Sequence, residues 1–140
     1  MKALFQRFAL IILLFSAIGT SLAGTHRGYE PKMLETGKFL FQGNCAACHG
    51  MNAEGTVKNG HKKNESGKHP PPPLNGTAHT WHHSFKALVH TIRNGTQSIG
   101  GSMPSWKSKL SDEEIGAIII WLTSLWPDEV YASWLERNKQ

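Results

Sequence analysis

The chain has 140 residues, which is enough for one ordinary domain and too few for two of common size. Its 15 lysines and arginines outnumber its 10 aspartates and glutamates, which gives a formal charge of +5. Loss of an N-terminal segment with Lys2 and Arg7 would lower this charge to about +3, which is too small an excess to indicate a nucleic-acid partner. Only two cysteines are present, both inside one short motif, which excludes a scaffold built on several disulfides.

The N-terminus has the pattern of a secretory signal peptide over residues 1–23. Two basic residues precede an apolar stretch at residues 8–19, which is short of the roughly 20 residues that a membrane-spanning helix needs. Small residues follow, so we expect cleavage after Ala23, a mature domain of residues 24–140 and export to the periplasm or outside the cell. The alternative is an uncleaved segment that anchors the same domain to a membrane.

The first predicted helix runs from Pro31 to Phe41 and continues toward Cys45, because its apolar residues fall partly on helical spacing. Gly37 inside it lowers helix stability, and its use would be close approach to another helix; the alternative is an indifferent surface position. Residues 50–76 are rich in turn formers and poor in apolar side chains, which predicts a loop. Such a long loop is unusual in a compact domain, but a bound prosthetic group would supply its hydrophobic contacts.

Three more helices are expected in the second half of the chain. One begins near Ser84 and ends at Asn94, where an Asn-Gly pair provides a stop signal. The next begins at Ser111, whose spacing from Glu114 is that of a capping box, and ends before the following proline. Apolar and aromatic residues at helical spacing within residues 128–140 predict a short terminal helix that folds back on the domain. No strand pattern is convincing, so the predicted fold class is all-α.

The motif Cys45-Ala-Ala-Cys48-His49 has the spacing of covalent haem attachment. Two thiols with two residues between them can add to the vinyl groups on one side of a porphyrin, and the next histidine can reach the iron as proximal ligand. A disulfide between cysteines so close together would add little stability. A thioredoxin-like redox pair would need a βαβ pattern, and a zinc site would need distant histidines such as His61 or His69. The motif therefore predicts one covalently bound haem c.

A sixth iron ligand is expected at Met103. Met1 lies in the signal peptide, Met51 is too close to His49 to reach the opposite face of the haem, and Met33 belongs to the first predicted helix. The remaining methionine lies in a loop whose glycines permit a tight backbone path and whose proline restricts the backbone just after it. Iron held by a histidine and a methionine has no open position, which favours electron transfer over catalysis, and the thioether raises the reduction potential.

Several histidines compete with this methionine: His61, His69, His79, His82, His83 and His90. The pair His82-His83 beside Trp81 is open to packing at the haem edge, donation to a propionate, surface exposure or iron ligation. The histidine-rich stretch over residues 61–83 also raises the hypothesis of adventitious copper or zinc binding. Trp106, in the loop after the candidate methionine, is expected to form a wall of the haem crevice.

Taken in order, these motifs resemble those of class I, cytochrome c-like monohaem proteins over nearly the whole mature sequence. The likeness rests on residues 37–50, 72–74, 101–104 and 111–122. It implies a small all-α fold of about four helices wrapped around one covalent haem. It also implies that two helices cross near Gly37, opposite Ile118 or Trp121. The polar insert of residues 58–69 and the tryptophan-rich C-terminal tail depart from the family pattern.

The resemblance further implies which residues support the haem. Pro72 or Pro73 would accept a hydrogen bond from the His49 imidazole and fix its orientation, and Leu74 would touch the haem face.

The attachment motif and the sixth ligand together predict an exported electron carrier that is not itself an enzyme. It would exchange single electrons with a redox donor and acceptor, soluble or membrane-bound, as a monomer or in transient complexes. Lysines available for a docking face are Lys58, Lys62, Lys63, Lys68, Lys86, Lys107 and Lys109. Two rival functions stay open. One is an oxidoreductase, either a small peroxidase or a subunit of a periplasmic complex, and the other is a haem-based sensor in which Met103 releases the iron for a small gas.

Overall fold

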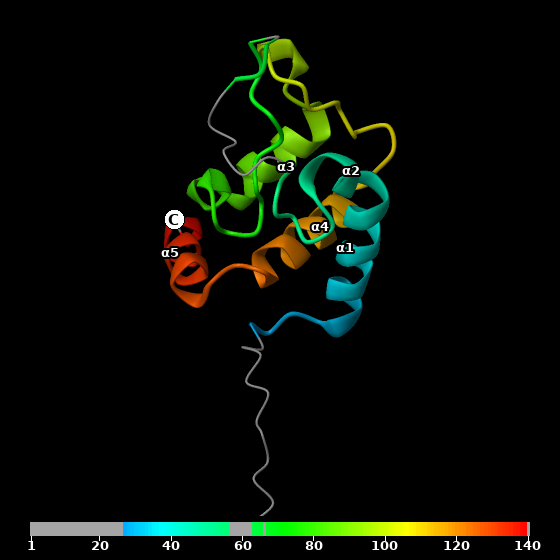
Figure 1. Ribbon diagram of the computed structural model, residues 1–140. Coiled ribbons are helices and arrows are strands. Elements are labelled where there is room, and N and C mark those ends of the chain that lie inside the picture. The colour runs from blue at the N-terminus through cyan, green and yellow to red at the C-terminus, as the bar shows by residue number, and fades with distance from the viewer. Residues whose placement is uncertain (1–26, 57–62, 66, 140) are drawn as a thin grey trace, which may run out of the picture.

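Figure 1 shows the computed structural model, which describes residues 27–56, 63–65 and 67–139. These residues form five α-helices and two 3-10 helices and contain no strand, which confirms the predicted all-α fold. The expected signal peptide at residues 1–23 lies outside the described residues. Within the part of the chain that the structure describes, no helix is both long and apolar enough to cross a membrane.

The core forms where α1 (Pro31–Asn44) crosses α4 (Asp112–Ser124), seen in Figure 1 as the cyan and orange helices. Gly37 is buried at this crossing. A Cβ atom added to it would overlap the carbonyl group of Ala117 and lie 2.9 Å from the Cβ of Trp121. The absence of a side chain at Gly37 therefore lets the two helix backbones approach closely, as the family resemblance implied.

Two aromatic rings form the centre of the core. The rings of Phe41 and Trp121 lie with their centroids 4.7 Å apart, which is close enough for a favourable aromatic contact. Buried isoleucines of α4 surround them: Ile115, Ile118 and Ile119. Ile118 was the other expected partner of Gly37, but the nearest atoms to this glycine belong to Ala117 and Trp121.

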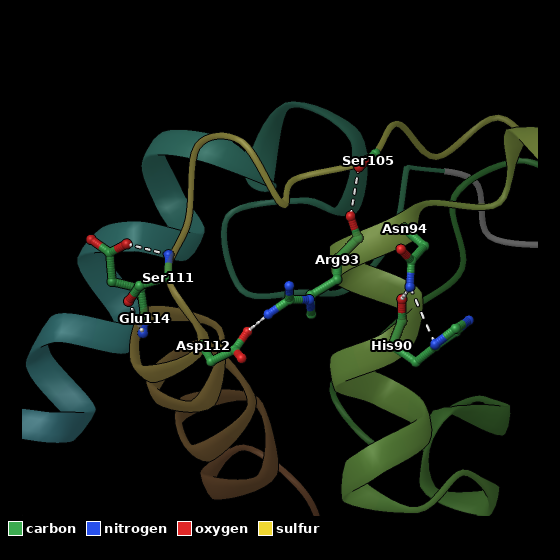
Figure 2. Close-up of polar contacts among 7 residues, drawn as sticks. All are labelled: His90, Arg93, Asn94, Ser105, Ser111, Asp112 and Glu114. Carbon is green, nitrogen blue, oxygen red and sulfur yellow. Dashed lines mark hydrogen bonds and ion pairs between the residues drawn. The ribbon is translucent and has the colours of Figure 1, made fainter.

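The N-terminus of α4 has the capping box that the sequence predicted (Figure 2). The hydroxyl oxygen of Ser111 accepts a hydrogen bond from the Glu114 amide at 3.2 Å, and a Glu114 carboxylate oxygen accepts one from the Ser111 amide at 2.8 Å. We expect Ser111→Ala to lower the free energy of unfolding by about 1 kcal/mol, because it leaves a helix amide without its partner. Denaturant unfolding measures this loss. Ser108→Ala, a change at an exposed serine before the helix, is the control and should leave stability nearly unchanged.

Of the remaining elements, the two long helices pack against α4 or against a short 3-10 helix. The helix α3 (Phe85–Asn94) packs against α4, and α5 (Asp128–Asn138), red in Figure 1, packs against η1 (His79–His82). The single turn α2 (Ala46–His49) follows α1, and η2 (Gln97–Ile99) follows α3. The four longer helices are thus the predicted ones. The three short elements have too few residues to show a helical period in the sequence.

Candidate haem-binding site

One mainly apolar cavity of about 990 Å³ is lined by the side chains that the sequence predicts to bind haem. This volume is at the upper end of the range of about 300–1,000 Å³ that is usual for ligand pockets. Cys45, Cys48, His49 and Met103 all line it, although Met103 is far from the other three in the sequence. Two thiols, an imidazole and a thioether around an apolar space are the donor set that a covalently held haem needs, so the cavity fits this group.

His49 is the last residue of α2 and is only 8% exposed. Its Nδ1 lies 2.9 Å from the carbonyl oxygen of Pro72. In the neutral tautomer that donates this hydrogen bond, Nε2 keeps its lone pair for a metal. Burial lowers the pKa of His49, and the bond to Pro72 only partly opposes this effect, so the ring is neutral at physiological pH. Neutral imidazole is the form that binds metals.

Pro73, the other expected acceptor, has a different partner. Its carbonyl oxygen accepts a hydrogen bond from the hydroxyl of Thr80 at 3.2 Å. Pro73 and Thr80 both line the cavity, and Thr80 is buried, so this bond ties the proline segment to η1. In the structure, Pro72 is therefore the residue whose carbonyl is hydrogen-bonded to the imidazole of His49. The carbonyl of the next residue, Pro73, points toward Thr80 instead.

Leu74 lines the cavity, and both of its backbone polar groups are hydrogen-bonded. Its amide donates to the carbonyl of Ala53 at 2.7 Å, and its carbonyl accepts from the indole nitrogen of Trp126 at 2.7 Å. Ala53 is fully buried and has a left-handed φ of 58°, which is uncommon for a residue other than glycine. The role of Trp126 could not be deduced from the sequence; the available signal was that a buried tryptophan needs an acceptor for its N–H.

The two cysteines differ in exposure. Cys48 is exposed, whereas burial raises the pKa of the half-buried Cys45 thiol to about 11, with a smaller contribution from the nearby Cys48. Cys45 is therefore protonated at neutral pH. The reactive cysteine of a thioredoxin-like pair has a lowered pKa instead, so Cys45 does not have the environment of such a reactive thiol.

Both backbone polar groups of Met103 are hydrogen-bonded to Thr96. The Met103 amide donates to the hydroxyl oxygen of Thr96 at 3.1 Å, and the Met103 carbonyl accepts from the Thr96 amide at 2.9 Å. Gly95, with a left-handed φ of 69°, leaves room for the Met103 carbonyl beside it. Further along, the hydroxyl of Ser105 donates to the carbonyl of Arg93 at 2.6 Å (Figure 2). These contacts fix the Met103 backbone at the cavity.

Of the other histidines and methionines considered as iron ligands, some line the cavity and others do not. Those that line the cavity are His69, His79 and His83, and all three are exposed. Those that do not line it are Met33, Met51, His82 and His90; the ring of His90 lies against Asn94 in Figure 2. His61 lies outside the described residues. Among the described side chains, no group of three or more His, Cys, Asp or Glu could hold a metal ion, so neither the zinc nor the copper hypothesis gains support.

Charge at the cavity is one-sided. Two of the lysines considered for docking, Lys63 and Lys68, line it, and no described aspartate or glutamate does. Lys58 and Lys62 lie outside the described residues. Trp106 is half-buried, lines the cavity and packs against the core, as expected for a wall of the crevice.

The sequence model of the family described as "Cytochrome C oxidase, cbb3-type, subunit III" matches residues 32–122. The cbb3-type cytochrome c oxidase subunit CcoP of Azospirillum brasilense is 35% identical over 100 residues, which are 71% of this chain and 30% of that protein. Cytochrome c6 of Bryopsis maxima is 35% identical over 91 residues, which are 64% of this chain and 88% of that protein. The subunit FixP of Azorhizobium caulinodans is 35% identical over 107 residues, 75% of this chain and 31% of that protein.

This chain therefore spans less than a third of the length of these cbb3 subunits and most of the length of cytochrome c6. No solved structure matches it significantly. The family match covers well over half of the chain and includes the attachment motif, Met103 and the crossing of α1 and α4. The chain belongs to the class I c-type cytochromes, in the family described as cytochrome c oxidase, cbb3-type, subunit III.

Proposed function

We propose that this protein is an exported electron carrier that holds one haem c through Cys45 and Cys48 and binds its iron with His49 and Met103. The observation that carries the proposal is that these four side chains, from two distant parts of the chain, line one apolar cavity. When bound, the haem supplies reversible one-electron exchange at its iron.

The protein's own groups prepare the site for this chemistry. The Pro72 carbonyl holds the His49 ring in one orientation and one tautomer, with Nε2 free to bind. Apolar side chains of α3 and α4, among them Ile92, Ile119 and Leu122, line the cavity. A bound haem would face these groups rather than water on this side, which affects its reduction potential.

Met103 is a better candidate for the second axial ligand than the histidines at the cavity. Its backbone is held by two hydrogen bonds to Thr96, and its side chain is half-buried. The side chains of His69, His79 and His83 are exposed to water. A carrier with both axial positions filled by the protein would exclude small gases, unlike a sensor or a peroxidase.

The charge around the cavity favours an acidic redox partner. Lys63 and Lys68 place positive charge at its rim, where no described aspartate or glutamate lies, and positive charge at a docking edge speeds encounters with acidic proteins. A second candidate function, a cytochrome subunit of an oxidase complex, is favoured by the similarity to CcoP and FixP. The independent carrier is preferred, because this chain spans 88% of a cytochrome c6.

The test is expression of the full chain in a bacterium with a periplasmic haem-attachment system. We expect the denatured protein to keep one haem by mass and to begin at Gly24. The native protein, when reduced, should bind carbon monoxide poorly. A Cys45→Ala, Cys48→Ala double variant is the control, because it lacks both thiols and should lose the haem on denaturation. A wild-type chain without attached haem would refute the proposal, and ready binding of carbon monoxide would favour the sensor or the enzyme.

A further inference from the structure

The segment after the family match reaches the back of the cavity wall. The match ends at residue 122, and Trp126 follows the end of α4. Trp126 is only 3% exposed, and its indole N–H donates to the Leu74 carbonyl at 2.7 Å. Leu74 lies two residues after Pro72, whose carbonyl holds the His49 ring. A residue outside the matched region is thus hydrogen-bonded to the segment that orients the candidate proximal ligand.

The segment between these bonds is stiff. Pro72 and Pro73 each have a ring that restricts φ, so the position of Leu74 constrains the position of the Pro72 carbonyl. Leu74 is bonded on both sides, by its amide to Ala53 and by its carbonyl to Trp126. Loss of the bond to Trp126 would leave the Leu74 carbonyl without this donor. The segment would keep the bonds of Pro73 to Thr80 and of Leu74 to Ala53, but with one bond fewer it could shift relative to His49.

Trp134 offers a matched comparison in the same cluster. It is 6% exposed, and its ring meets that of Trp126 edge to face with centroids 5.5 Å apart. Its indole N–H donates to the carbonyl of His83 at 2.8 Å, at the far end of η1 from the proline segment. The two tryptophans thus have similar burial and the same kind of backbone acceptor, but only Trp126 is bonded beside Pro72.

We propose that Trp126 is a positioning residue for His49, acting through Leu74 and Pro72 on the orientation of the imidazole. This inference rests on the proposed binding of haem iron by His49. A carbonyl that accepts from the imidazole N–H makes the ring a stronger electron donor, which stabilises the oxidised iron. A weaker bond from His49 to Pro72 should therefore raise the reduction potential.

The experiment compares haem-loaded wild type, Trp126→Phe and Trp134→Phe. Each variant keeps an aromatic ring and loses one indole donor, so both should unfold at a lower temperature than wild type. We expect Trp126→Phe alone to raise the reduction potential, measured by optical titration, and to speed solvent exchange of the His49 Nδ1–H, measured by NMR. If Trp126→Phe does not fold, Trp126→Leu lacks the same donor and carries the same expectation.

The outcomes separate this inference from the function on which it rests. Equal potentials in the three proteins, or equal shifts in both variants, would overturn the positioning role while the attached haem still supports the carrier. A wild-type chain that carries no covalent haem would instead refute the proposed function.

Discussion

Replacement of Gly37 by alanine is expected to destabilise the protein by about 3 kcal/mol, near the upper end of the usual cost of overpacking. The added methyl group would overlap the backbone carbonyl of Ala117 and crowd the Cβ of Trp121. Neither group can turn away as a flexible side chain would, so α1 and α4 would have to separate. Because these helices form the core, urea unfolding of the haem-loaded protein should detect the loss directly.

Gly43→Ala is the matched control, because it makes the same change in the same helix. A Cβ at Gly43 would have no neighbour within 4 Å, and alanine is the better helix former. We therefore expect this variant to be neutral or to gain about 0.5–1 kcal/mol of stability. Equal effects at the two positions would contradict the close contact at Gly37.

The long helices could be predicted because their ends have local signals. Ser84 and Ser111 both accept a hydrogen bond from a backbone amide in the first turn of the helix that begins after them, and Gly95 follows the end of α3. The exact partner of Gly37 could not be predicted, because neighbouring residues of α4 differ in position by only a fraction of a helical turn. Ala117 and Trp121 are one turn apart and together face the glycine.

The residues of the candidate site were predictable where spacing alone indicates a chemistry, as in the motif that ends at His49. The choice between Pro72 and Pro73 was not, because adjacent prolines offer identical carbonyl groups. In the structure the two carbonyls have different partners, His49 for Pro72 and Thr80 for Pro73, and no sequence signal indicates this division. The hydrogen bond of Trp126 could not be predicted either, because its acceptor is a backbone carbonyl that any residue at position 74 would present.

Met103→Ala in the haem-loaded protein is expected to open one axial position of the iron. The loop should stay in place, because Thr96 holds the backbone of Met103 and makes both bonds without its side chain. The reduced variant should then bind carbon monoxide readily. Its reduction potential should fall by on the order of 0.1 V, because a thioether ligand favours reduced iron and axial ligands set haem potentials over a wide range. Visible spectra and a redox titration measure the two effects.

Met51→Ala makes the same truncation at a methionine that is 54% exposed and does not line the cavity, so its spectra and potential should equal those of wild type. The comparison therefore tests the side chain of Met103 rather than methionine content. If Met103→Ala also behaves as wild type, the sixth ligand must be another residue, and among the described residues His69, His79 and His83 at the cavity become the candidates. A histidine ligand would lower the potential of the wild-type protein itself, so the absolute value would separate the two arrangements.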